Sequence, residues 1–339
     1  GSPTTYSSTV TPYSSVATLS NLATSTGSIS PTFASGTSSY SLSVANSVST
    51  ITVTPTLTDA NASLTVNGNA ATSGVASSSI GLNVGVNTVT VRVTAQNGVN
   101  TSTYTITITR APSSDATLAG LTTSVGAPSP TFASLTTSYT LSVAYGVTSL
   151  SVRPTVNEPN AVVTVNGTSV TSGSYSGSIS LSVGTNTITV ATTAQDGSTT
   201  SSYTITVTRA HADQAALTIT TTSAVYPQTL SLGFSGGSGT GAVTYSVVSG
   251  SCTISAGVLT PTAPGSCVIQ ATRAGDSQYN PVTSASTTIT IDRGTQTLSF
   301  GSTSYALAYG ATQTVSASSS VGTGAITYSD TGSTACTVN

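Results

Sequence analysis

The sequence predicts an all-β protein built from tandem β-sandwich domains, and two observations support this prediction. Apolar and polar residues alternate on both sides of an Asn-Gly pair within residues 87–110, which is typical of a β-hairpin with one buried face. The same pattern returns 99 positions later, around an Asp-Gly pair in residues 186–209. Since successive side chains leave a strand on opposite faces, the rows of Val and Ile should form a core and the rows of Thr should face water.

The composition narrows the classes of function. Charged residues make up 4% of the chain, against roughly 25% in an ordinary soluble domain. All six basic residues are arginines, the net charge is −2, and no basic cluster is present, so the chain lacks the footprint that nucleic acid requires. No apolar run reaches the roughly 18–20 residues of a membrane helix, and no membrane insertion is expected in this segment.

Two repeats follow a short first segment. Residues 1–16 lack clean alternation, which predicts either a lead-in or the end of a preceding repeat. The repeats, at residues 17–111 and 112–210, correspond without a gap. Strand-like segments recur about every 8–12 residues without helical periodicity, which predicts a sandwich of about seven strands. In the first repeat the expected strands before the hairpin cover residues 39–44, 50–57, 63–68 and 80–85, and Phe33 and Tyr40 should close the ends of the core.

Both repeats resemble the bacterial cadherin-like β-sandwich repeat. Each carries an L-x-x-L opening, a P-x-F segment, V-N-G, T-A-x-x-G and a closing segment from Tyr to Arg, at residues 104–110 and 203–209. The resemblance implies a domain of large secreted or surface-attached bacterial proteins. It does not imply calcium, because true cadherins clamp Ca²⁺ with clustered carboxylates and the junction at residues 111–115 offers only Asp115. No cofactor or metal is expected.

The pattern changes in residues 211–292, where two cysteines stand 15 residues apart and an A-G-D-x-x-Y segment follows at residues 274–279. These features resemble a bacterial immunoglobulin-like repeat. Cys252 and Cys267 are expected on consecutive strands, and the resemblance implies a disulfide between them. Such a bond would close a loop of about 15 residues, worth ~3 kcal/mol, and would require an oxidising compartment. Two buried thiols are the alternative.

Residues 293–339 match the beginning of the third unit, since Tyr309 corresponds to Tyr226 and Cys336 to Cys252. They predict an incomplete immunoglobulin-like domain. Either the sequence stops within a domain, or a neighbouring molecule supplies the missing strands, as in donor-strand complementation.

The residues that catalysis requires are sparse. His211 is the only histidine and Glu158 the only glutamate, and the acids are scattered mostly over turns and junctions, where Asp forms local hydrogen bonds. No enzyme is predicted. Tyr145 and Tyr175 stand where the first repeat has Asn46 and Ala76. Exposed tyrosines can stack on sugars, so these two are candidate ligand contacts, with ordinary sequence drift as the alternative.

Together these features predict an extracellular structural protein, a rod-like stalk or fibre segment of a bacterial cell-surface or filament-forming protein. Its expected partners are copies of itself, in filaments or lateral packing, or other surface proteins, because the strand edges carry little charge to prevent pairing. An adhesin segment that binds glycans or proteins is one alternative. A spacer module of a secreted enzyme is another.

Overall fold

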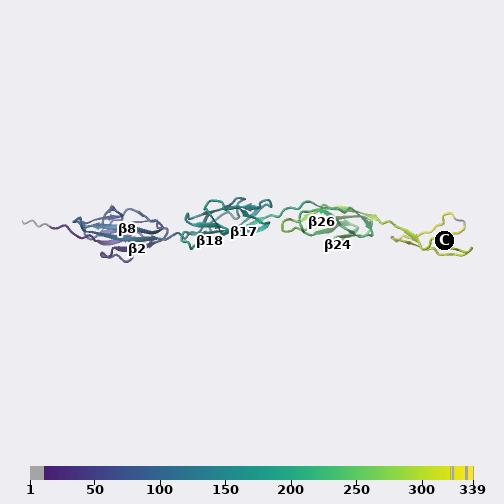
Figure 1. The fold of residues 1–339 in the computed structure, drawn as a ribbon, viewed down its shortest axis with the longest axis horizontal. Helices are drawn as coiled ribbons and strands as arrows, with labels where there is room; N and C mark the ends of the chain where they lie inside the picture. The colour runs from purple at the N-terminus through teal and green to yellow at the C-terminus, as the bar shows by residue number, and fades with distance from the viewer. Residues whose placement is uncertain (1–10, 321, 323, 333–334, 339) are drawn as a thin grey trace, which may run out of the picture. The chain divides into compact units, whose positions relative to one another are not determined.

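The computed structural model describes residues 11–320, 322, 324–332 and 335–338. Strands and loops account for these residues, and none of them lies in a helix. The strands form three sandwiches with separate sheets, followed by a pair of short strands (Figure 1). The predicted all-β class of tandem sandwiches is therefore confirmed.

The first sandwich places a five-stranded sheet, in the order β2-β9-β8-β5-β6, with the two-stranded pairs β1-β4 and β3-β7. Its strands are β1 (Leu19–Thr24), β2 (Ser39–Val44), β3 (Thr50–Ile51), β4 (Val53–Leu57), β5 (Ser63–Val66), β6 (Asn69–Ala71), β7 (Ile80–Gly81), β8 (Gly85–Thr94) and β9 (Thr101–Arg110).

The predicted hairpin is the pair β8–β9, which runs antiparallel over ten residue pairs from Gly85↔Arg110 to Thr94↔Thr101. Its apolar row is buried as expected, with exposed fractions of at most 3% for Val89, Val91, Val93, Ala95, Tyr104, Ile106 and Ile108. The connection is longer than the two-residue turn that an Asn-Gly pair favours. It is closed by the Ala95 N–H, which donates to the Asn100 carbonyl over 2.9 Å.

Strand β9 lies inside its sheet and is paired on both sides. Its second neighbour is β2, which runs parallel to it from Ser39↔Thr105 to Val44↔Arg110. Parallel pairing needs a crossover connection, and the chain between residues 44 and 101 provides it by building the rest of the sandwich. The last strand of the repeat is thereby held between an early strand and a late one.

Two tyrosines close the core of the first sandwich. The Tyr104 hydroxyl accepts a hydrogen bond from the Leu19 N–H (3.1 Å) and donates one to the Ser35 carbonyl (3.0 Å). The Tyr40 hydroxyl donates to the Ala34 carbonyl over 2.9 Å. Phe33 is half-buried and stacks on the Tyr40 ring with 5.9 Å between centroids, so it covers the core at the position that the sequence predicts.

The second sandwich repeats this topology, with sheet order β11-β18-β17-β14-β15 and the pairs β10-β13 and β12-β16. Its strands are β10 (Leu118–Thr123), β11 (Ser138–Val143), β12 (Ser149–Leu150), β13 (Val152–Val156), β14 (Val162–Val165), β15 (Thr168–Val170), β16 (Ile179–Ser180), β17 (Gly184–Thr193) and β18 (Thr200–Arg209).

The strand count differs from the prediction of about seven, because each of the first two sandwiches has nine strand segments. The segment expected as one strand at residues 50–57 is divided at Thr52, since β3 pairs with β7 whereas β4 pairs with β1. The short strand β6 follows the two-residue Asn67-Gly68 turn, where both residues have positive φ (48° and 80°), as a tight hairpin turn requires.

The third sandwich has a sheet ordered β20-β28-β26-β23, with β27 paired to β26, facing the sheet β21-β25-β24 and the pair β19-β22. Its strands are β19 (Leu217–Ile219), β20 (Ser223–Tyr226), β21 (Leu230–Ser231), β22 (Phe234–Gly236), β23 (Val243–Gly250), β24 (Cys252–Ser255), β25 (Val258–Pro261), β26 (Gly265–Arg273), β27 (Val282–Thr283) and β28 (Thr287–Arg293). The sequence pattern did not predict β20, β25 or β27.

The remaining segments contain little regular structure among the described residues. Residues 11–16 form no strand, and residues 1–10 of the predicted lead-in lie outside the described part. Near the other end, β29 (Leu298–Phe300) pairs antiparallel with β30 (Ala317–Ser319). Leu298 and Phe300 are about half exposed, so this hairpin has no buried core comparable to those of the three sandwiches.

Candidate functional site

An arginine at the end of the last strand ties two loops together in the first repeat. The Arg110 guanidinium donates to the Asn46 carbonyl through Nε (2.8 Å) and Nη2 (2.6 Å), and to the Leu82 carbonyl through Nη1 (2.8 Å). Asn46 returns a hydrogen bond from Nδ2 to the Ala111 carbonyl over 3.0 Å. A planar group with several fixed donors suits such a clamp better than a lysine would.

Tyr145 lies at the equivalent clamp of the second repeat. Arg209 Nε donates to the Tyr145 carbonyl over 2.8 Å, as Arg110 does to Asn46. In addition, the Arg209 guanidinium carbon lies 4.9 Å from the centroid of the Tyr145 ring, within the range of a cation–π contact. Tyr145 is 36% exposed, so the arginine holds its ring while part of the residue stays in water.

Tyr175 is paired with a different arginine. Arg153 lies on β13, its guanidinium carbon is 6.0 Å from the Tyr175 centroid, and its Nε donates to the Gly173 carbonyl over 2.6 Å. The first repeat has Thr54 and Ala76 at these two positions, so both partners of the contact differ together. The Tyr175 side chain is 53% exposed. The structure thus gives each candidate tyrosine an arginine of its own, in a separate loop.

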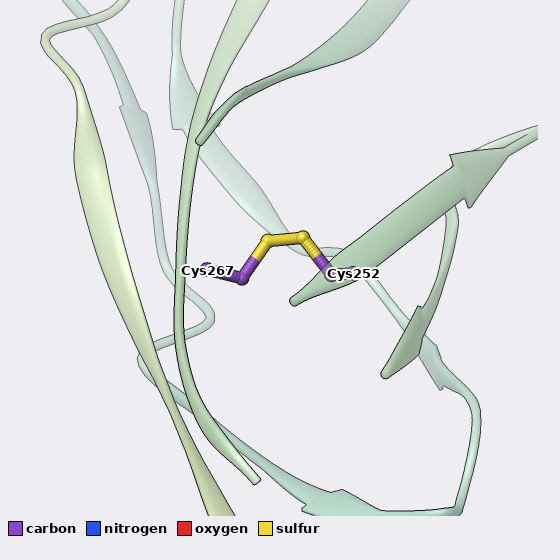
Figure 2. The surroundings of a disulfide bond; sticks show 2 residues. All are labelled: Cys252 and Cys267. Atoms are coloured by element: carbon purple, nitrogen blue, oxygen red, sulfur yellow. A yellow bond between two sulfur atoms is a disulfide. The ribbon is translucent and has the colours of Figure 1, made fainter. Parts of the chain in front are cut away.

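The two cysteines of the third sandwich are joined by a disulfide, with 5.8 Å between their Cα atoms (Figure 2). The sequence predicted that the two cysteines lie on consecutive strands, and this prediction is wrong. Cys252 begins β24 and Cys267 lies in β26, with β25 between them in the chain. Since β24 and β26 belong to different sheets, the bond staples the two layers of the sandwich together. Cys267 is fully buried and Cys252 nearly so.

Two half-buried aspartates, Asp276 and Asp196, accept hydrogen bonds from loop residues around them. Asp276 accepts hydrogen bonds from the N–H groups of Thr240 (2.7 Å), Gln278 (2.8 Å) and Tyr279 (3.0 Å), and these bonds, that of Thr240 first, lower its pKa to about 2. Asp196 accepts hydrogen bonds from the hydroxyl and the N–H of Thr199. These bonds, that of the hydroxyl first, lower the pKa of Asp196 to about 2. Asp276 therefore links its own loop to the loop that contains Thr240, whereas Asp196 is held within its own loop.

Three further features of the described part of the chain concern metal clusters, membrane-spanning helices and surface depressions. No three His, Cys, Asp or Glu side chains lie close enough to hold a metal ion. No helix among the described residues is long and apolar enough to cross a membrane. A shallow depression follows the short hairpin strand of each of the first two sandwiches, next to β6 and β15, and aliphatic, hydroxyl and amide side chains line it.

Pattern reading of the sequence missed the arginine contacts. One signal was available, because Arg153 and Tyr175 change together between two repeats that otherwise align without a gap. The clamp formed by Arg110 gave no such signal, since its acceptors are backbone carbonyls and any residue type supplies those.

An arginine clamp fastens loops within each of the first two sandwiches, and a disulfide joins the two sheets of the third. Such sandwiches in tandem define a class of repeat proteins made of small β domains. Residues 14–111 and 114–210 match the model of the cadherin-like β-sandwich domain. The chain belongs to this family. A search of curated protein sequences found no significant match.

Solved structures with similar segments include cadherin and immunoglobulin repeats. Mouse cadherin-23 EC22–24 is 11% identical, with 79% of this chain and 98% of that chain covered and a TM-score of 0.30. Drosophila N-cadherin EC1–3 is 11% identical, with 76% of this chain and 100% of that chain covered and a TM-score of 0.31. Titin domains I67–I69 are 10% identical, covering 75% and 96%, with a TM-score of 0.29.

Proposed function

We propose that the chain is a load-bearing segment of an extracellular stalk or fibre, in a bacterial cell-surface or filament-forming protein. The observation that carries this proposal is the position of the last strand in each cadherin-like repeat. Strand β9 is bonded along six residues to β2 and along ten to β8. A force applied at its end must therefore shear two rows of hydrogen bonds together.

Three further features support this role. The Arg110 clamp fastens the end of β9 to two loops, at the point where the chain leaves the first sandwich. The disulfide of the third sandwich fits an oxidising environment outside the cell. The family's domains are typically extracellular. The chain has six arginines and no lysine, so a trypsin-like protease finds few cleavage sites.

Pulling on single molecules tests the proposal. The full chain is tethered by its ends and stretched, and the expected record contains separate cooperative unfolding events for the sandwiches. Electron microscopy of the untethered chain tests self-association, and regular filaments are the expected result for a fibre subunit. Gradual extension at low force, without discrete events, would contradict a load-bearing role.

The two arginine-held tyrosines favour a second candidate, a segment that itself binds glycans. Tyr145 and Tyr175 present partly exposed rings that arginines hold in place, and such rings can stack on sugars at low entropic cost. A glycan array probed with the wild-type chain, Tyr145→Ala and Tyr175→Ala tests this. Tyr13→Ala is the matched control, because Tyr13 is 73% exposed and outside the repeats. Binding that survives both loop substitutions would exclude these tyrosines as the site.

A further inference from the structure

Three Asn-Gly pairs occur in the chain, at Asn67-Gly68, Asn97-Gly98 and Asn166-Gly167. An asparagine followed by glycine can lose its amide, because the glycine nitrogen can attack the Asn Cγ and no Cβ hinders the approach. Whether it does so in a folded protein depends on where the side-chain carbonyl points. The structure separates the three pairs on this criterion.

Asn97 folds its side chain forward over its own following peptide. The Oδ1 atom accepts hydrogen bonds from the N–H groups of Val99 (3.0 Å) and Asn100 (3.1 Å). The first of these bonds closes an Asx-turn around the Gly98 peptide, which brings Cγ towards the Gly98 nitrogen. Asn97 is half-buried and Gly98 is exposed, in the connection between β8 and β9. The electrophilic Asn97 Cγ and the attacking Gly98 nitrogen are therefore neighbours in a loop that solvent reaches.

Asn67 and Asn166 point the other way. The Asn67 Oδ1 accepts from the Thr90 N–H over 2.9 Å, and its own N–H donates to the Thr90 carbonyl over 2.9 Å. Asn166 makes the equivalent bonds to Thr189, over 2.9 and 2.8 Å. Both side chains thus reach across to a neighbouring strand, away from the glycine that follows. Attack on Cγ would first require the side chain to leave this strand.

The second repeat shows that the loop can hold the product. Asp196 occupies the position of Asn97, and its Oδ1 accepts from Ser198 N–H and Thr199 N–H, each over 2.8 Å. The same backbone closure is present, since the Ala194 N–H donates to the Thr199 carbonyl over 2.8 Å. An aspartate at position 97 therefore needs no change in the hairpin backbone; only the Asn100 amide, whose Oδ1 accepts from Asn97 Nδ2 over 2.8 Å, must turn so that its Nδ2 faces the carboxylate.

We propose that Asn97 is a site of spontaneous deamidation in the folded protein, favoured over Asn67 and Asn166. The Gly98 nitrogen forms a bond to Asn97 Cγ, the Cγ–Nδ2 bond breaks, and ammonia leaves. Water then opens the cyclic imide at either carbonyl and gives aspartate or isoaspartate. The Gly98 N–H donates to the Ala95 carbonyl over 2.9 Å, so this bond must open first, and the folded protein should react more slowly than the unfolded chain.

The consequence is a change in charge and in chain length. Each conversion adds one negative charge to a protein whose formal net charge is −2. The aspartate product should leave the hairpin intact, as Asp196 does, whereas isoaspartate adds a methylene to the main chain within the loop. The first repeat would therefore record the age of a long-lived molecule, independently of the proposed load-bearing role.

The test follows all three sites in one sample. The full chain is incubated at mildly alkaline pH, folded or in concentrated urea, then digested with trypsin. Cleavage after Arg92 and Arg110, with Arg153-Pro154 resistant, puts Asn67, Asn97 and Asn166 in separate peptides. Mass spectrometry measures the exchange of amide for acid in each peptide, and enzymatic methylation of isoaspartate separates the two products. Asn97→Gln, incubated in parallel, should abolish conversion in that peptide.

The expected result is conversion at Asn97 several-fold faster than at the other two pairs in the folded chain, and similar rates at all three in urea. Asn97→Asp should melt at the wild-type temperature, because the loop accepts a carboxylate. The proposal is overturned if Asn67 or Asn166 converts as fast as Asn97 in the folded chain. It is equally overturned if Asn97 stays intact there while all three convert in urea, or if Asn97 leads by the same factor in both states.

Discussion

Replacing Cys252 and Cys267 together by alanine should lengthen the unfolding step of the third sandwich under force. With the disulfide intact, the 15-residue separation between the two cysteines stays closed, and only the 5.8 Å between their Cα atoms contributes to the stretched length. An extended chain spans at most ~3.3–3.6 Å per residue, so the freed segment adds about 45 Å to the contour length. The intact bond should also stabilise this sandwich by ~3 kcal/mol through the loop that it closes.

The assay is single-molecule stretching of the full chain, before and after addition of a reductant. All variants carry Cys336→Ser, because Cys336 is free and exposed and could link two molecules. The first two sandwiches contain no cysteine, so their steps serve as an internal control and should not change. If the third step has the same length in the double variant as in the oxidised chain, the inter-sheet staple does not exist in the protein.

Three further predictions concern individual contacts, each measured by urea unfolding. Tyr104→Phe removes a hydroxyl with two backbone partners inside the first sandwich and should cost about 1–3 kcal/mol, whereas Tyr175→Phe should change little. Arg110→Lys cannot reproduce the clamp on two carbonyls and should cost about 1–3 kcal/mol, with exposed Arg92→Lys as the control; equal effects of the two changes would refute the clamp. The pKa of Asp196 falls from 3.8 to about 2 on folding, so its contribution is complete above pH 3.8 and is lost as the pH falls towards 2. Asp196→Asn should remove this part of the acid sensitivity, and an unchanged pH profile would contradict the assignment.

The hairpin pattern was predictable because it depends only on local geometry. Side chains alternate between the two faces of a strand. The apolar row from Val89 to Ala95 therefore lies on one face, and that face is buried in the core. The repeat spacing added the second sandwich, and recurring turn residues placed most strands within a few residues of their positions. Period, turn chemistry and duplication are all properties of neighbouring residues, and these are what the printed sequence contains.

The tertiary structure alone decided which segments meet. Residues 50–57 look like one strand, yet they divide at Thr52 because the first part pairs with β7 and the second part with β1. The short strand β25, between Cys252 and Cys267, places them in opposite sheets. Parallel pairing of β2 with β9 and the clamp of Arg110 use backbone N–H and C=O groups, which every residue type shares. Sequence patterns record side-chain preferences, so contacts made through the backbone are settled only when the chain is folded.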